Sequence, residues 1–286
     1  MSTTVVCSVG TSAAKGFMAI EQLAAWAQSQ PSSRAAGKVL FERFRNVLPA
    51  GEALQKKLSA EIHSLTRIGV NATDRVILLC SETPDGEACA EAVRFYLEQH
   101  FNGIDCRIEK VIGLQVHDAK RFKQEGVVNF VRHCLQAVND FGAQHVILNP
   151  TGGYKALVPY TVLVGMLKRA PCQYIFEQST QLLVLPPLPL SVDRNPFERY
   201  RQLIEEIERD SCIPLRRWQE QVRREDVSVL EPLVEIHDSQ VTMSAVGILF
   251  LDEVRTPTAL VPFLSRQAWS DCFDNLSRLA QCDPFR

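Results

Sequence analysis

The residues best suited to chemistry are two glycines, a lysine and a hydroxyl that follow a short apolar run. The run Val146–Leu148 predicts a buried strand that ends at Asn149-Pro150. The residues that come next, where a helical pattern begins, are Thr151, Gly152, Gly153, Tyr154 and Lys155. Backbone N–H groups at a helix start are unpaired and partly positive, and glycine lets a ligand approach the main chain. We therefore predict a phosphate-binding turn here.

Two other predicted strands end in polar residues of the same kind. The strand Val5–Val9 is followed by Gly10, Thr11 and Ser12, and the strand Arg75–Cys80 is followed by Ser81, Glu82 and Thr83. In a doubly wound sheet the loops at the carboxyl ends of the strands converge where the strand order reverses. One such loop is usually only a helix N-cap, whereas three together predict a phosphate or nucleotide site.

Basic residues at the start of a later helix allow two interpretations. Lys120, Arg121 and Lys123 precede a long amphipathic pattern that runs to Val138. They either supply positive charge to the rim of the site or lie on a solvated helix face. We include Arg121 among the candidate ligand-binding residues.

Strand and helix patterns alternate over the first two thirds of the chain. Further strands are predicted at 106–114, 173–176 and 182–185, and the last two form a hairpin. Residues 1–190 are therefore predicted to be an α/β domain, a doubly wound, Rossmann-like, mostly parallel sheet with an edge hairpin. After a proline-rich stretch, two helices, a polar two-stranded turn and a helix to Val254 predict a small, mainly helical, winged-helix-like domain over 191–286.

Composition narrows the class of protein. The 286 residues are 46% hydrophobic and 22% charged, as in ordinary globular proteins. The apolar runs fall short of a membrane span of about 20 residues, and no basic region or cleavage site precedes the first strand. Nine scattered cysteines without a CxxC pair predict reduced thiols rather than disulfides or a zinc site. A cytoplasmic protein that does not enter membranes is expected.

Charge and motifs bear on partners and cofactors. Residues 194–286 contain 12 arginines, no lysine and 16 acidic residues. This balance does not favour DNA binding, which depends on phosphate neutralisation, although the pairs Arg216-Arg217 and Arg223-Arg224 leave weak nucleic-acid contact open. The chain has neither a GxGxxG nor a GxxxxGK[ST] motif, and no HExxH motif, so no cofactor and no metal are predicted.

Four separated motifs resemble those of CARF domains, the sensors of type III CRISPR defence that bind cyclic oligoadenylates. The motifs are SVGTS at 8–12, SETPDG at 81–86, NPTGGYK at 149–155 and FEQSTQLLVLPPLPL at 176–190. The stretches LSAEIHSL at 58–65 and DAKRFKQEG at 118–126 also resemble this family. The resemblance implies a homodimer with its two-fold axis through the ligand site. A cyclic tetra-adenylate, preferred over a hexa-adenylate, would then meet two copies of each loop.

Some proteins that this chain resembles also cleave their ligand and are called ring nucleases. Their chemistry needs no metal, because a ribose 2′-hydroxyl attacks the adjacent phosphate while the protein aligns it and stabilises charge on the phosphate oxygens. The resemblance gives Lys155 the charge-stabilising role and makes Ser12 the residue that positions ribose or phosphate. Residues 191–286 contain neither the Arg–His motif of HEPN ribonucleases nor a PD-(D/E)xK-like carboxylate cluster. We expect them to brace the dimer or to cover the ligand.

Three hypotheses follow. The first is a CARF receptor that binds cyclic tetra-adenylate and slowly cleaves it. The second is a non-catalytic sensor, either a ligand-gated transcription regulator or the sensor part of an effector whose toxic domain is absent from this chain. The third is an unrelated nucleotide-dependent enzyme on a Rossmann-like sheet. The sequence leaves open the ring size, the occurrence of cleavage and the role of residues 191–286.

Overall fold

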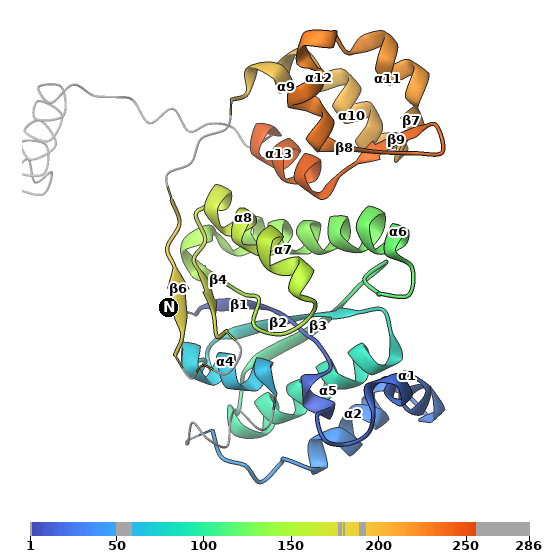
Figure 1. The fold of residues 1–286 in the computed structure, drawn as a ribbon. Coiled ribbons are helices and arrows are strands. Elements are labelled where there is room, and N and C mark those ends of the chain that lie inside the picture. Colours follow the sequence, from blue (N-terminus) through green and yellow to red (C-terminus); the bar gives the residue numbers. More distant parts are fainter. Residues whose placement is uncertain (1, 50–58, 177–178, 180, 189–192, 256–286) are drawn as a thin grey trace, which may run out of the picture. The chain divides into compact units, whose positions relative to one another are not determined.

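A six-stranded sheet forms the centre of the N-terminal part of the protein (Figure 1). The computed structural model describes residues 2–49, 59–176, 179, 181–188 and 193–255. The strands are β1 Thr4–Ser8, β2 Arg75–Ser81, β3 Asp105–Val111, β4 Val146–Asn149, β5 Cys172–Tyr174 and β6 Leu183–Leu185. Their order is β3-β2-β1-β4-β5-β6; β6 pairs antiparallel with β5, and the other neighbours pair parallel. The predicted mostly parallel sheet with an edge hairpin is confirmed.

Helices cover both faces of this sheet (Figure 1). One face packs against α4 Ala60–Ile68 and α5 Pro84–His100, and α1 Ile20–Ser29 and α2 Ser33–Glu42 pack in turn on α5. The other face packs against α7 Val127–Phe141 and α8 Val158–Lys168. In β1, Val5 and Cys7 belong to the first core and Val6 to the second. Successive side chains of a strand point to opposite faces, so a strand covered on both faces has an unbroken apolar sequence.

Helix α4 begins and ends at residues suited to helix capping. Ser59 caps α4 by accepting a hydrogen bond from the Ile62 N–H at 2.9 Å, and Gly69 ends the helix in the left-handed region with φ 87°. The predicted helix after residue 119 consists of α6 Ala119–Arg121, the π-helical turn η2 Phe122–Gly126 and then α7. Among the described helices, none is long and apolar enough to cross a membrane.

The C-terminal part is mainly helical with a small sheet. Its elements are α9 Asn195–Arg199, α10 Arg201–Asp210, β7 Ile213–Pro214, α11 Leu215–Gln221, η5 Arg224–Asp226, α12 Val227–Leu230, η6 Glu231–Leu233, β8 Val234–His237, β9 Gln240–Met243 and α13 Ala245–Arg255. The antiparallel order is β7-β9-β8. Asp238 and Ser239 both have positive φ, as a tight two-residue hairpin turn needs. The predicted mainly helical part is present; the winged-helix assignment, the boundary near residue 190 and the role of residues 191–286 stay predictions, and 189–192 and 256–286 lie outside the described residues.

Acidic residues of the C-terminal part pair with basic residues that precede α7. Lys120 lies 2.6 Å from Asp238, and Lys123 lies 2.7 Å from Glu235. Helix α13 also packs against α7 and α8. An exposed ion pair contributes only about 0–1 kcal/mol, so burial of apolar surface dominates this contact and the charges help to fix its register. The pairing accounts for part of the acidic, lysine-free composition of residues 194–286.

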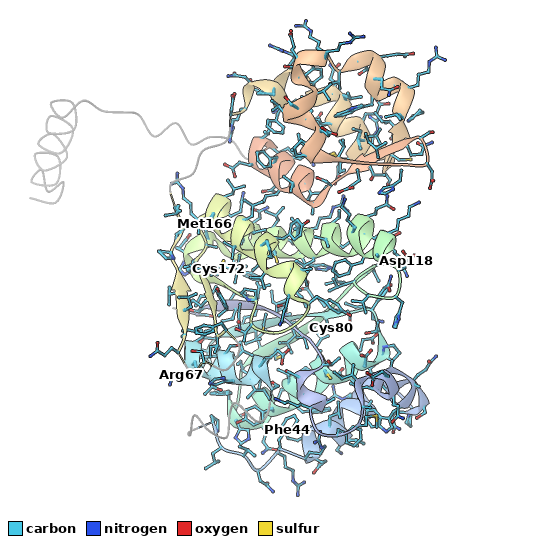
Figure 2. All side chains as sticks on the ribbon, in the orientation of Figure 1. Phe44, Arg67, Cys80, Asp118, Met166 and Cys172 are labelled. Carbon is cyan, nitrogen blue, oxygen red and sulfur yellow. The ribbon has the colours of Figure 1, made fainter. Side chains whose placement is uncertain are left out.

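All seven cysteines among the described residues are free thiols, and only Cys212 is exposed. Figure 2 shows Cys80 and Cys172 among the packed side chains around the sheet. Burial raises the pKa of each of these two thiols to about 12. They are therefore uncharged at neutral pH and behave as small apolar core residues.

Candidate functional site

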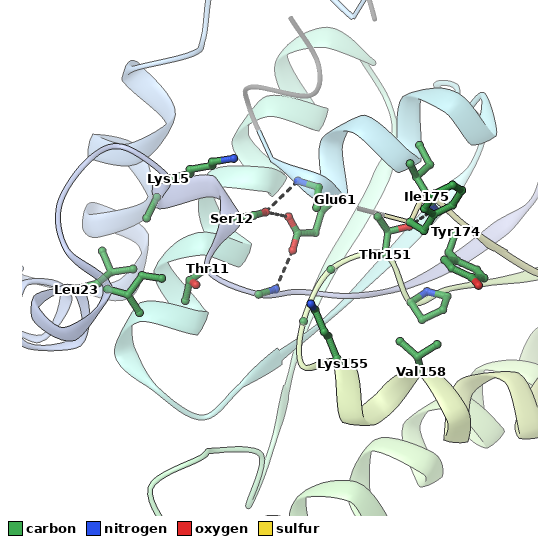
Figure 3. A pocket seen from close by; sticks show the side chains of 18 of the residues that line it. Thr11, Ser12, Lys15, Leu23, Glu61, Thr151, Lys155, Val158, Tyr174 and Ile175 are labelled. Atoms are coloured by element: carbon green, nitrogen blue, oxygen red, sulfur yellow. Dashed lines mark hydrogen bonds between the residues drawn. The ribbon is translucent and has the colours of Figure 1, made fainter. Parts of the chain in front are cut away.

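The strand order reverses between β1 and β4, and this places a cavity at the carboxyl ends of these strands. From β1 the chain passes to β2 and β3 on one side and then returns to β4 on the other side of β1. Loops that leave neighbouring strands in opposite directions open a crevice at such a point. The cavity found there has a volume of about 760 Å³ (Figure 3), within the range of small-molecule sites.

Two of the three predicted loops line this cavity. They are the loops that follow β1 and β4, together with the first residue of the 3-10 turn η4 Lys155–Leu157. The predicted site residues that line the cavity are Gly10, Thr11, Ser12, Thr151, Gly152, Gly153 and Lys155. The structure therefore brings together seven of the twelve predicted residues at one place.

The other five predicted residues are not among those that line the cavity and form a cluster of their own. Ser81 Oγ and Thr83 Oγ1 lie 2.7 Å apart, and the Arg121 guanidinium lies 2.7 Å from Glu82. Burial raises the pKa of the Tyr154 phenol, and the nearby Ser81 hydroxyl lowers it by a smaller amount. The cause of the separation is topological: β1 lies between β2 and β4, so the loop after β2 is one strand further from the reversal point.

Thr83 and the basic residues near Arg121 have structural partners. Thr83 is the N-cap of α5 and its Oγ1 accepts a hydrogen bond from the Gly86 N–H. Arg121 pairs with Glu82 and with Glu125. An N-cap explains Thr83 without a ligand, as is usual for a hydroxyl residue before a helix.

The glycines of the two lining loops are needed because the loops touch one another. A Cβ on Gly10 would lie 2.9 Å from the Gly153 nitrogen, and Gly153 itself has φ +80°. A Cβ on Gly152 would collide with Glu61 Oε1. Side chains at these positions would separate the loops, so the glycines serve contact between the loops as well as access for a ligand.

Glu61, in the first turn of α4, binds the loop after β1 and lies against Gly152 of the other loop; it is a site residue that the sequence analysis did not single out. Its carboxylate accepts hydrogen bonds from the Gly10 N–H at 2.8 Å and from the Ser12 hydroxyl (Figure 3). The residue is 0% exposed. The signal in the sequence is an acidic residue within an apolar helical stretch, because a buried carboxylate requires donors to satisfy it.

The side chain of Asn149, the last residue of β4, hydrogen-bonds the glycine loop that follows it. Its side-chain amide donates to Ser64 Oγ at 2.7 Å, and its Oδ1 accepts hydrogen bonds from the Thr151 N–H and the Thr151 hydroxyl. The Thr151 hydroxyl also accepts a hydrogen bond from the Ile175 N–H at 3.0 Å. The proton of Thr151 is therefore already committed inside the protein, and this residue acts mainly as a brace for the loop.

Replacement of Asn149 with alanine is expected to lower the free energy of unfolding by about 2 kcal/mol, because the buried Ser64 hydroxyl and the partly buried N–H and hydroxyl of Thr151 lose their partner. Chemical denaturation of both proteins measures this difference. The Asn139→Ala variant is the control, since Asn139 makes one exposed hydrogen bond to Asp252. A loss no larger than that of the control would contradict the bracing role.

Two lysines give the cavity positive charge. Figure 3 shows the Lys155 side chain extending toward the glycine loops, and Lys15 lies on the other side of Ser12. Lys15 is a second residue that the sequence analysis missed; among the described residues no ion-pair partner is found for its ammonium. It follows the 3-10 turn η1 Ser12–Ala14, three residues after Ser12.

Apolar and aromatic side chains also line the cavity. Among them are Ile20, which is 67% exposed, Phe176, which is 58% exposed, and Tyr174. Exposed large apolar side chains at the edge of a cavity are suited to flat apolar groups of a ligand. No group of three or more His, Cys, Asp or Glu side chains that could hold a metal ion is found in the part of the chain that the structure describes.

Residues 56–188 match a family model described as CRISPR-associated protein (Cas_APE2256). The matched segment includes Glu61 and the glycine loop with Lys155, whereas the loop after β1 precedes it. No curated protein matches the chain.

Proposed function

We propose that the protein is a homodimeric CARF receptor that binds cyclic oligoadenylate, with cyclic tetra-adenylate preferred over hexa-adenylate. We further propose that it slowly cleaves the ring by attack of a ribose 2′-hydroxyl, without a metal. The match of residues 56–188 to a CRISPR-associated family model supports the assignment to CRISPR defence.

The observation that carries the proposal is the pairing of two glycine loops with a lysine at the strand reversal point. The loops after β1 and β4 bring glycine main chain to the cavity, and Lys155 adds positive charge beside them. Helix starts and glycine-rich turns of this kind suit phosphate groups. The ligand class that fits is therefore one with exposed phosphates.

Symmetry supports a ring-shaped ligand. A cyclic tetra-adenylate carries four phosphate charges, and two copies of Lys155 and Lys15 in a dimer would supply four positive charges. A two-fold interface repeats every contact, so a ligand that itself has two-fold symmetry uses both copies equally. Each charged hydrogen bond contributes roughly 1.5–3 kcal/mol, and duplication of the contacts therefore gives tight binding.

The apolar part of the cavity lining suits the adenine bases. Tyr174, Phe176 and Ile20 line the cavity, and Phe176 and Ile20 are well exposed. A base stacked on an aromatic side chain contributes about 1–3 kcal/mol. A cyclic oligoadenylate carries both phosphates and bases, and a cavity lined by lysines and by aromatic side chains can contact both.

A second candidate function, a sensor that binds the ring and leaves it intact, is favoured by one observation. The hydroxyl protons of Ser12 and Thr151 are both donated to protein groups, to Glu61 and Asn149 respectively. Fewer donors then remain to stabilise a reacting phosphate. This sensor would be a ligand-gated transcription regulator or the sensing part of an effector.

The test is incubation of the purified full chain with labelled cyclic tetra-adenylate in the presence of EDTA. We expect saturable binding, weaker binding of cyclic hexa-adenylate, and slow appearance of linear products that end in a 2′,3′-cyclic phosphate. Linear tetra-adenylate is the control ligand, and size-exclusion chromatography with light scattering measures the oligomeric state.

The outcomes separate the hypotheses. A ring that binds and stays intact after hours with excess protein removes the nuclease and leaves the sensor. A ring that does not bind at all, or that binds no better than the linear control, removes both.

A further inference from the structure

We infer that Glu61 acts behind Ser12 in a proton relay: Ser12 accepts the proton of the ribose 2′-hydroxyl as it passes its own proton to Glu61. In this scheme Ser12 contacts the substrate, and Glu61 is a positioning residue that works through Ser12. The inference rests on the cleavage activity proposed above and names the group that activates the nucleophile.

The burial of Glu61 supports an indirect role. Glu61 lines the floor of the cavity but is 0% exposed, so a ligand reaches its carboxylate only through a residue in front of it. Ser12 is that residue: it is only partly buried, lines the cavity and donates its hydroxyl proton to Glu61 Oε2 (Figure 3).

The hydrogen bonds of Ser12 leave one position open toward a ligand. A hydroxyl has one proton and two acceptor positions. The proton goes to Glu61, and one acceptor position is taken by the Ala60 N–H at 2.9 Å. The remaining position can accept a hydrogen bond from a ribose 2′-hydroxyl. These two hydrogen bonds thus hold Ser12 as an acceptor for the group that must lose a proton.

The proton transfer balances without a further reactant. The bond between the 2′-oxygen and phosphorus forms while the bond from phosphorus to the 5′-oxygen breaks. The 2′-proton moves to Ser12 Oγ as the Ser12 proton moves to Glu61 Oε2, and the departing 5′-oxygen takes a proton from water. The products are a 2′,3′-cyclic phosphate and a 5′-hydroxyl, after which Glu61 returns its proton to water through Ser12.

Glu61 has a bracing role as well, and the two roles use different oxygens. Oε1 accepts from the Gly10 N–H and ties α4 to the loop after β1, whereas Oε2 faces Ser12. The Glu61→Gln variant keeps an acceptor for Gly10 and replaces the proton acceptor with an amide that donates. The substitution therefore preserves the brace and removes the relay.

The experiment measures ring affinity and single-turnover cleavage for the wild type, Glu61→Gln, Ser12→Ala and the double variant. For Glu61→Gln we expect the cleavage rate to fall about 100-fold, the scale of one general base, with the dissociation constant within a factor of about 3. Ser12→Ala leaves the bond between Glu61 and Gly10 intact, and we expect the same separation of rate from affinity. The double variant should be no slower than the slower single variant, because both changes break one relay.

A matched control is Glu42→Gln, the same chemical change on the exposed surface of α2, which should leave both quantities unchanged. Cleavage by either single variant at the wild-type rate overturns the relay and leaves the proposed function standing. Equal losses of affinity and rate in Glu61→Gln show a brace alone and also overturn it. An intact ring with wild-type protein ends the relay together with the cleavage activity, and failure of the wild type to bind ends the proposed function itself.

Discussion

Replacement of Lys155 with alanine is expected to weaken the binding of cyclic tetra-adenylate about 1000-fold. The reason is that a symmetric dimer loses two charged hydrogen bonds at once, each worth roughly 1.5–3 kcal/mol, and each factor of ten corresponds to about 1.4 kcal/mol. Lys155 is exposed and is the first residue of η4, so its removal leaves no cavity in the core. The loss should therefore appear in affinity and in cleavage while the melting temperature stays close to that of the wild type.

Titration of the labelled ring at two salt concentrations measures this effect. The wild-type affinity should fall with added salt more steeply than that of Lys155→Ala, since fewer charges meet phosphate in the variant. Lys38→Ala is the matched control: it removes the same charge from an exposed position on α2 that does not line the cavity. Unchanged ring affinity in Lys155→Ala would show that the ligand site lies elsewhere.

The strands of the sheet were predictable because burial on both faces requires an unbroken run of apolar residues in the sequence. The runs that became β1, β2 and β4 are apolar without alternation, which is what a strand covered by helices on both faces requires. The turns of the site were predictable for a related reason. Glycines and hydroxyl residues that directly follow such runs are the residues that can leave a strand and start a helix in two or three steps.

The order of the strands in the sheet has no comparable pattern in the sequence. The loops after β1, β2 and β4 look alike in sequence, and each has hydroxyl residues at a helix start. Only the arrangement β3-β2-β1-β4 decides that the first and last of these loops share a cavity and that Ser81–Thr83 does not line it. The family resemblance did not separate these loops either, because all three lie within its motifs.

The role of Glu61 could not be predicted from the sequence for a similar reason. Its two partners, Gly10 and Ser12, precede it by 51 and 49 residues. A local pattern predicts that α4 has an apolar face, and an acid on that face looks like an exception. Only the folded chain shows that the carboxylate meets two donors there. The pairing of Lys120 with Asp238 escaped prediction in the same way, since 118 residues separate them.

Replacement of Gly152 with alanine is expected to abolish ring binding at concentrations that saturate the wild type. The added Cβ would collide with Glu61 Oε1 and would lie 2.5 Å from the carboxyl carbon, so either the loop or the carboxylate must move. Movement of the carboxylate breaks its hydrogen bonds to Gly10 and Ser12 inside a buried site. Overpacking together with these unsatisfied groups should cost about 3 kcal/mol of folding free energy.

Thermal denaturation and ring titration of the same sample distinguish the collision with Glu61 from the backbone strain that replacement of another glycine with alanine would also cause. The expected loss corresponds to a melting temperature lower by about 5 °C for a protein of this size. Gly69→Ala is the control: Gly69 has φ +87°, and no heavy atom lies within 4 Å of the place that a Cβ would take, so this substitution introduces backbone strain without a collision. A Gly152→Ala protein that melts with the control and binds the ring normally would show that Glu61 and the glycine loop are not in contact, and the architecture of the site argued above would be wrong. Loss of binding at a melting temperature still far above the assay temperature would instead show that the contact between these two groups shapes the ligand site directly.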